Sequence, residues 1–147
     1  MTFPRRAMHP LGALLGQVQA RFHEDCEARM AAAGFGDLSL AHGVNVMRHL
    51  QPGVPRRISE VVRLSTVTKQ AISQQVAYLV ERGYVAVTPD ERDRRAKCVS
   101  LTARGEAAQA TTRRIFGEVE SDWRDRYGAD RMRELFATLE AIVTHPE

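Results

Sequence analysis

The segment from Ile58 to Gly105 constrains the fold of this chain more than any other part of the sequence. It reads ISEVVRLSTVTKQAISQQVAYLVERGYVAVTPDERDRRAKCVSLTARG. Helix-capping residues and the stop at Gly83 predict two short helices separated by a tight turn. The β-forming residues that follow predict two strands joined by a polar turn. The expected elements are helices over 59–64 and 68–82, strands over 84–88 and 97–101 and a turn over 89–95, with Ser59 and Thr68 as N-caps. Two helices followed by a hairpin in this order are typical of a winged helix-turn-helix.

Amphipathic helices flank this segment on both sides. Apolar residues at three- and four-residue steps predict a first helix over 11–33. The other expected elements are a helix over 39–50 capped by Ser39, a loop at Pro52, Gly53 and Pro55, a long helix from Thr102 to Tyr127, and a last helix capped by Asp130. The fold class that we predict is mainly α with a small β-hairpin wing.

The terminal helices carry apolar stripes that are too long for the small central segment to cover. A single chain arranged in this way either packs the stripes on itself or exposes apolar surface, and a twofold-related second copy is the simplest cover for such a surface. We therefore expect a homodimer. One protomer spans residues 1–147, with dimerisation helices over 10–36 and 103–147 and a winged helix-turn-helix lobe over 39–102.

The helix over 68–82 has two unlike faces. Its apolar residues, Ile72, Val76, Leu79 and Val80, face inward, and the opposite face is polar and almost uncharged near its start. A recognition helix needs such a face, because its first residues contact base edges in the major groove and Gln pairs with adenine through two atoms. The residues expected to read DNA are Thr68, Lys69, Gln70, Ser73 and Gln74.

The turn PDERDRRAK is the second candidate DNA-binding element. An arginine at such a hairpin tip can enter a narrow minor groove, where the negative potential is concentrated. We expect Asp93 to pair with Arg95 and fix its direction, since Asp–Arg pairs hold a planar geometry well. The other basic candidates are Arg92 and Arg94 at the tip, and Arg57 and Lys97 as phosphate contacts.

The charge distribution agrees with this assignment. Residues 56–97 hold nine basic and five acidic residues, a net charge of +4, whereas the remaining 12 basic and 13 acidic residues leave −1. The whole positive excess of the chain therefore lies where attraction to phosphates requires it.

Residues 59–105 resemble the winged-helix core of the multiple-antibiotic-resistance regulator (MarR) family. The resemblance rests on TKQAISQQV, on ERGYV, and on a D-x-R motif followed by LT-x-x-G, here Asp93, Arg95, Leu101, Thr102 and Gly105. It implies a homodimeric transcriptional regulator, usually a repressor, on a pseudo-palindromic operator in double-stranded DNA. It also implies release by a small phenolic or aromatic ligand in a cleft beside the DNA-binding lobe, for which His42, Val46 and His49 are candidates. Val87 replaces an arginine that relatives often carry, which puts one phosphate contact in doubt.

Composition and motifs exclude several other classes of protein. The chain is 44% hydrophobic and 27% charged, and no apolar run approaches the roughly 18 residues of a membrane span. Only two cysteines are present, and neither a Ser–His–Asp set nor a glycine-rich phosphate loop is evident. We expect a cytoplasmic protein that is not an enzyme and has no cofactor and no metal.

Two alternatives to a ligand-responsive regulator stay open. Cys26 is a candidate redox switch, although it lies on an apolar stripe where cysteine is usually a small buried hydrophobe; Cys98 is a weaker candidate. His23 and Glu27 stand one helical turn apart, but without further metal ligands they indicate a solvated helix face. The chain is alternatively a winged-helix protein-interaction module that does not bind DNA.

Overall fold

The computed structural model describes residues 9–145, so residues 1–8 and 146–147 of the expected protomer lie outside the described residues. The helices are α1 (Leu11–Ala32), α2 (Leu40–Asn45), the 3₁₀ turn η1 (Met47–His49), α3 (Ile58–Leu64), α4 (Lys69–Glu81), α5 (Ala103–Tyr127) and α6 (Ala129–Thr144). The strands are β1 (Arg56–Arg57), β2 (Val85–Pro89) and β3 (Lys97–Leu101). The predicted fold class, mainly α with a small wing, is confirmed.

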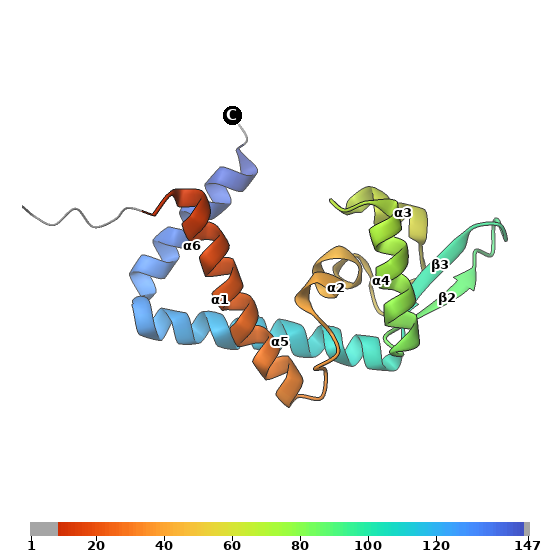
Figure 1. Cartoon of the computed structure of the whole chain (residues 1–147), viewed down its shortest axis with the longest axis horizontal. Helices are drawn as coiled ribbons and strands as arrows, with labels where there is room; N and C mark the ends of the chain where they lie inside the picture. The colour runs from red at the N-terminus through yellow and green to blue at the C-terminus, as the bar shows by residue number, and fades with distance from the viewer. Residues whose placement is uncertain (1–8, 146–147) are drawn as a thin grey trace, which may run out of the picture.

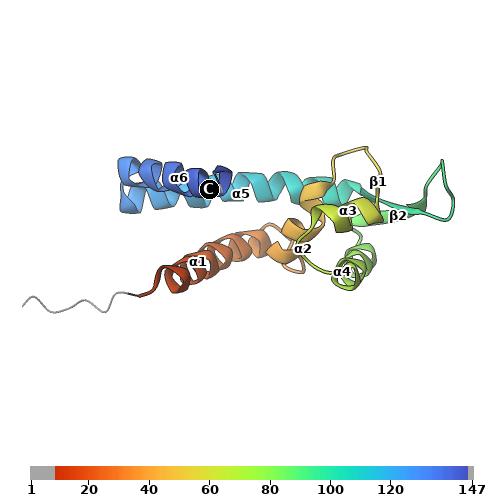
Figure 2. The same cartoon turned by 90° about the horizontal axis from the view of Figure 1, so that it is seen from above.

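Helix α5 connects the two ends of an elongated molecule (Figure 1). At one end α1 crosses α5, and α6 leaves the end of α5 at an angle and rises past α1 (Figure 1). Figure 2 shows α1 on one side of the molecule and α5 with α6 on the other. At the other end α2, α3, α4 and the sheet form a compact lobe, from which the β2–β3 hairpin projects as a wing. The described part of the chain contains no helix that is long and apolar enough to cross a membrane.

The sheet has three antiparallel strands in the order β1-β3-β2. In β2–β3 the register places Val85 opposite Leu101 and Pro89 opposite Lys97, which leaves a turn close to the predicted one. Strand β1 was not predicted. It pairs Arg56 with Val99, a partner more than 40 residues away in sequence, and no local pattern reports such a pairing.

One core runs from the lobe into the α1–α5 crossing. The buried side chains of α4 (Ile72, Val76, Leu79) and the sheet meet Ile115 and Val119 of α5 and Cys26 and Met30 of α1. At the crossing, Phe22 packs edge-on against Phe116 and Trp123, with ring centroids 5.3 and 5.7 Å away. The lobe and the terminal helices are therefore packed together through a shared core.

The predicted helix ends are partly confirmed. Thr68 Oγ1 accepts a hydrogen bond from the Ala71 N–H at 3.2 Å, and Thr102 Oγ1 accepts one from the Gly105 N–H at 3.1 Å. Gly83 ends α4 with a φ of +79°, in the left-handed region that favours glycine. These three signals work because each cap depends on residues within one helical turn.

Other predicted ends are wrong. Ser59 and Asp130 lie inside the first turns of α3 and α6, whose N-caps are Arg57 and Gly128. The helix predicted over 39–50 ends at Asn45 and continues as η1, where Gln109 Nε2 donates to the carbonyls of Met47 and Leu50. A long-range side-chain contact therefore satisfies backbone carbonyls at the end of this segment.

Val80 was expected to face inward and is 41% exposed. It follows the fully buried Leu79 directly, and a step of one residue turns a helix by about 100°. The position falls on the flank of the apolar stripe rather than at its centre.

The two terminal helices expose an apolar surface at one end of the molecule. Leu11 is 70% exposed and Ile142 is 64% exposed, and further apolar side chains between them are also exposed. We call this surface the terminal patch; it comprises Leu11, Leu14, Leu15, Val18, Tyr127, Leu135, Phe136, Leu139, Ile142 and Val143. A groove between α1, the end of α5 and α6 runs through it, lined in part by Leu14, Val18 and Met132.

Candidate nucleic-acid interface

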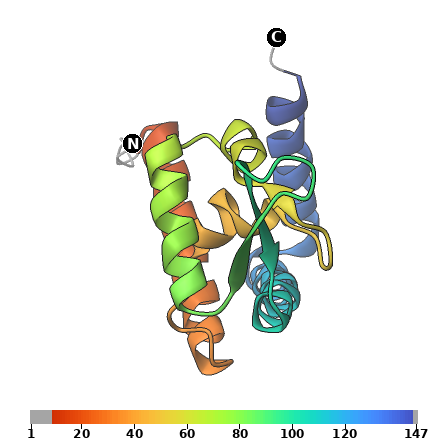
Figure 3. The same cartoon turned by 90° about the vertical axis from the view of Figure 1, so that its right-hand side faces the viewer.

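Helix α4 presents a polar face to solvent. Its inward residues Ile72, Val76 and Leu79 are buried, so the helix has a fixed rotation in the lobe. All five residues that we expected to read DNA, Thr68, Lys69, Gln70, Ser73 and Gln74, are exposed on the other side. Figure 3 shows α4 and the wing next to each other at the same end of the molecule.

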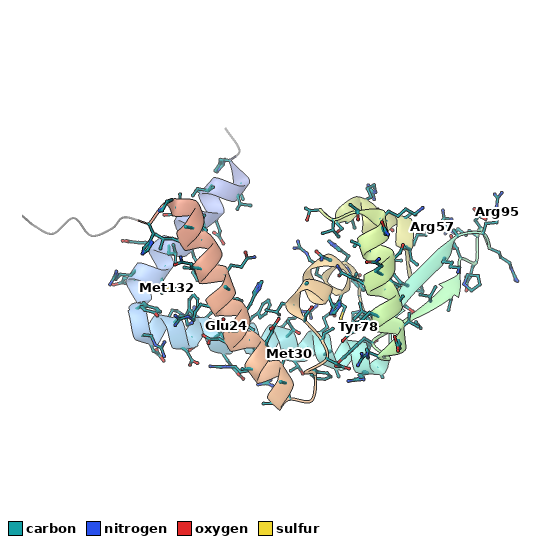
Figure 4. All side chains as sticks on the ribbon, viewed as in Figure 1. Glu24, Met30, Arg57, Tyr78, Arg95 and Met132 are labelled. Carbon is teal, nitrogen blue, oxygen red and sulfur yellow. The ribbon has the colours of Figure 1, made fainter. Side chains whose placement is uncertain are left out.

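Two aspartates shape the tip of the wing. The Asp93 carboxylate accepts hydrogen bonds from the backbone N–H of Arg95 at 3.1 Å and from its Nε at 3.3 Å. The Asp90 carboxylate accepts one from the backbone N–H of Arg92 at 3.2 Å. The predicted pair of Asp93 with Arg95 is thus present, and the Arg95 side chain remains 93% exposed at the far end of the wing (Figure 4).

Arg57 is engaged at the base of the wing. Its Nε donates to the Asp90 carboxylate at 2.5 Å, which ties β1 to the residue that follows β2. The Arg92 backbone N–H and the Arg57 guanidinium lower the pKa of Asp90, so this carboxylate is charged at neutral pH. Arg57 therefore holds the wing in place, a role that the sequence did not predict. Arg92, Arg94 and Lys97 are exposed.

A polar cluster lies at the C-terminal end of α4. The hydroxyl of Tyr78 donates to the backbone carbonyl of Asp37 at 2.5 Å, and the hydroxyl of Tyr84 donates to the Asp37 carboxylate. Arg104 of α5 lies 3.4 Å from that carboxylate and 4.3 Å from the Tyr84 ring centroid. Burial and the bond to Asp37 raise the pKa of Tyr84 to about 12, and the same hydrogen bond lowers the pKa of Asp37. We did not predict this cluster, because its members come from three separate segments.

A cavity of about 340 Å³ lies between α1, α2 and α5. Its walls are mainly apolar, and two arginines lie among the lining residues, which are Met30, Leu38, Ser39, Leu40, Gly43, Met47, Arg48, Gln109, Thr112, Arg113 and Phe116. The three residues expected in a ligand cleft, His42, Val46 and His49, do not line this cavity. Val46 is fully buried, and His42 turns to stack on Tyr78.

The surroundings of the two cysteines and of the His23–Glu27 pair do not favour a redox or metal site. Cys26 is fully buried, and desolvation raises the pKa of its thiol to about 11, which opposes formation of a reactive thiolate. Burial also raises the pKa of Cys98. Among residues 9–145 no group of three or more potential ligands is placed to hold a metal ion, so His23 and Glu27 gain no further partner there.

Together, the helix pair, the exposed polar face of α4 and the arginine-tipped hairpin define a winged helix-turn-helix lobe. A family model described as the MarR family matches residues 44–96, from α2 through the wing. The resemblance to the MarR family is therefore confirmed.

One curated relative supports the resemblance to transcriptional regulators. The Transcriptional activatory protein BadR of Rhodopseudomonas palustris is 34% identical over 71 residues, which cover 45% of this chain and 41% of that protein. The matched part thus spans about two fifths of its length.

Solved structures share the fold. The reduced form of MarR from E. coli superposes with a TM-score of 0.78 at 20% identity, covering 93% of this chain and 98% of that one. The transcriptional repressor CouR bound to a 23-mer DNA duplex gives 0.75 at 23% identity, covering 97% and 99%. The Mycobacterium tuberculosis MarR family protein RV2887 in complex with salicylic acid gives 0.66 at 28% identity, covering 92% and 98%. These solved structures therefore share the overall fold of this chain.

Proposed function

We propose that this chain is a homodimeric, sequence-specific DNA-binding regulator of transcription. The observation that carries the proposal is the placement of two elements in one rigid lobe. The exposed polar face of α4 and the Arg95-tipped wing lie beside each other, in contact through β2. A helix that reads the major groove and a wing that reaches the adjacent minor groove need this relation.

Each candidate residue has a distinct role in this proposal. Gln70, Ser73 and Gln74 read base edges from the first two turns of α4, because the N-terminal part of a recognition helix approaches the bases most closely. Thr68 and Lys69 contact phosphate at the start of the helix, where free backbone N–H groups attract anions. At the wing, Arg94 and Arg95 enter or border the minor groove, while Arg92 and Lys97 contact its phosphates. Arg57 contacts a phosphate at the base of the wing, where its side chain is 44% exposed beside Asp90.

A second copy of the chain is the proposed cover of the terminal patch. The patch is built from both ends of the chain and lies far from the DNA-reading face, so pairing through it leaves both lobes free. The proposed division of the protomer is then the predicted one, with dimerisation helices over 10–36 and 103–147 and the lobe over 39–102. Two lobes related by a twofold axis require a pseudo-palindromic operator.

The cavity between α1, α2 and α5 is the proposed effector site. Apolar walls with Arg48 and Arg113 among them suit a small aromatic acid, because the ring is desolvated by the walls and the carboxylate pairs with a guanidinium. The complex of RV2887 with salicylic acid supports a ligand of this type. Binding of such a ligand releases the operator, so the protein acts as a repressor where the operator overlaps a promoter.

Selection of binding sites from a random duplex library tests the proposal. We expect enriched sequences to form an inverted repeat with half-sites about 10 base pairs, one helical turn, apart. Enrichment of no motif from a folded, dimeric protein would contradict DNA reading and favour a winged-helix protein-interaction module.

A further inference from the structure

The wall of the cavity and the support of the recognition helix are built from the same short segment. The cavity is lined by Leu38, Ser39, Leu40 and Gly43 of this segment. Two other residues of the same segment, Asp37 and His42, contact α4 instead. If an occupant of the cavity displaces residues 37–43, the contacts that the same residues make with α4 are therefore displaced as well.

His42 makes the first of these contacts. Its ring stacks on Tyr78 of α4, with centroids 4.5 Å apart and an interplanar angle of 10°. Its Nδ1 accepts a hydrogen bond from the backbone N–H of Ser39 at 3.2 Å, which fixes the ring relative to a residue of the cavity wall. Burial lowers the pKa of His42, although the nearby Asp37 carboxylate opposes the shift, and the neutral ring keeps Nδ1 as an acceptor.

Asp37 makes the second contact. Its carbonyl oxygen accepts the Tyr78 hydroxyl at 2.5 Å, so the ring of Tyr78 is stacked on one residue of the segment and hydrogen-bonded to another. On its own helix, the guanidinium carbon of Arg82 lies 4.8 Å from the same ring. Tyr78 is labelled in Figure 4, where it lies between α4 and α2.

The position of Tyr78 in α4 makes these contacts effective at a distance. Thr68 lies ten residues before Tyr78, which is roughly 15 Å along a helix that rises about 1.5 Å per residue. A tilt of about 10° about the Tyr78 end therefore moves the start of α4 by roughly 2–3 Å. At Gln70 and Ser73, which lie closer to Tyr78, the same tilt gives shifts of about 2 Å and about 1.3 Å. Hydrogen bonds to base edges tolerate only a few tenths of an ångström, so the base contacts of both residues would be broken or weakened.

We propose that Tyr78 couples the cavity to the recognition helix, with His42 and Asp37 as the contacts through which an occupant of the cavity tilts α4. The inference rests on the proposed effector role of the cavity, and it names the residues through which ligand binding there changes the orientation of α4. Tyr78 is a positioning residue in this account, because it acts on DNA only through the orientation of α4.

Amide NMR of the protein titrated with salicylate tests the coupling without DNA. In the wild-type protein we expect the amides of Gly43 and Thr112, at the cavity, to shift together with those of Gln74 to Glu81 in α4. In Tyr78→Phe, which removes only the hydroxyl, and in His42→Ala, which removes the stack, the cavity amides should shift as before. The α4 amides should shift at most half as far, and His145→Ala, an exposed histidine beyond α6, should match the wild type.

A second readout connects the coupling to DNA. The ratio of duplex Kd with and without saturating salicylate should fall toward 1 in both variants, from a wild-type value in the roughly 5–150-fold range of allosteric effects. Unchanged α4 shifts and an unchanged ratio in the variants would overturn the role of Tyr78. Salicylate shifts at neither Gly43 nor Thr112 of the wild-type protein would instead refute the effector site, and the coupling with it.

Discussion

Asp93 and Arg95 at the wing tip carry opposite charges, but both support the proposed contact of Arg95 with DNA. Arg95 is almost fully exposed, and Asp93 holds both its backbone N–H and its Nε. Arg95→Ala should weaken binding to the selected duplex by about 1–3 kcal/mol, because a minor-groove or phosphate contact is lost. Asp93→Ala should weaken it too, although the protein becomes more positive, because Arg95 loses its fixed direction. Fluorescence anisotropy gives both affinities, and gel filtration should show an intact dimer.

Tighter binding by Asp93→Ala would contradict the orienting role and indicate simple repulsion between Asp93 and DNA. Unchanged binding by Arg95→Ala would contradict the assignment of the wing. Neither Asp93 nor Arg95 is part of the buried core, so thermal unfolding midpoints close to the wild-type value serve as the control for folding.

The buried thiol of Cys26 makes a prediction about pH. Its pKa is raised from 9.0 to about 11, so the unfolded chain releases this proton at a lower pH than the folded protein does. The folded state is therefore favoured below pH 9, and the stability is lost as the pH rises from about 9 to about 11. Over this window the wild-type protein should lose up to about 2–3 kcal/mol more unfolding free energy than Cys26→Ala.

Urea unfolding at several pH values measures the unfolding free energies of the wild-type protein and of Cys26→Ala. Tyr84 and Cys98 are present in both proteins, so their ionisation cancels in the comparison. Equal pH dependence of the two proteins would mean that Cys26 ionises normally in the folded state.

At the scale of elements, the first turn of α5 sits directly against the loop that ends α4. A Cβ atom on Gly105 would lie 2.0 Å from the backbone carbonyl oxygen of Tyr84, so no side chain fits there. Gly105→Ala should destabilise the fold by about 1–3 kcal/mol, since backbone must move to make room. Gly117→Ala in the same helix is the matched control.

Nothing lies within 4 Å of a Cβ at Gly117, so alanine there should be neutral or stabilise by about 0.5–1 kcal/mol through helix propensity. Chemical unfolding of both variants gives the comparison. Equal stability of Gly105→Ala and the wild-type protein would contradict the close packing of α5 on the backbone of Tyr84.

The same elements show what the sequence could predict. Helix caps at Thr68 and Thr102 and the stop at Gly83 are local, and the sequence located all three. Strand β1 and the shortened α2 depend on partners in β3 and at Gln109, far along the chain, so periodicity gave no sign of them.

The candidate site divides in the same way. The exposed face of α4 and the Asp93–Arg95 pair follow from spacing within one element. The Arg57–Asp90 pair and the contacts of Tyr78 join separate segments, and only the folded chain brings them together. His42 was expected in a ligand cleft because of its helix, but its ring turns away from the cavity to Tyr78.

At the scale of the whole molecule, the terminal patch predicts self-association. Ile142→Asp places a charge in a patch that a second copy should bury, so we expect a monomer by sedimentation velocity at concentrations where the wild type is a dimer. Val54→Asp is the matched control, because Val54 is 48% exposed in the loop before β1 and lies outside the patch. A dimeric Ile142→Asp protein would place the interface elsewhere.

The central claim is specific reading of DNA by a dimer, and one titration tests it most directly. A duplex recovered by selection is titrated with the protein at low and at near-physiological salt, against a scrambled duplex of the same composition. We predict a preference of at least about 10³-fold for the selected duplex that persists at the higher salt, because base contacts add to the phosphate attraction. Equal binding of both duplexes, abolished together by salt, would show only a basic surface and contradict the account.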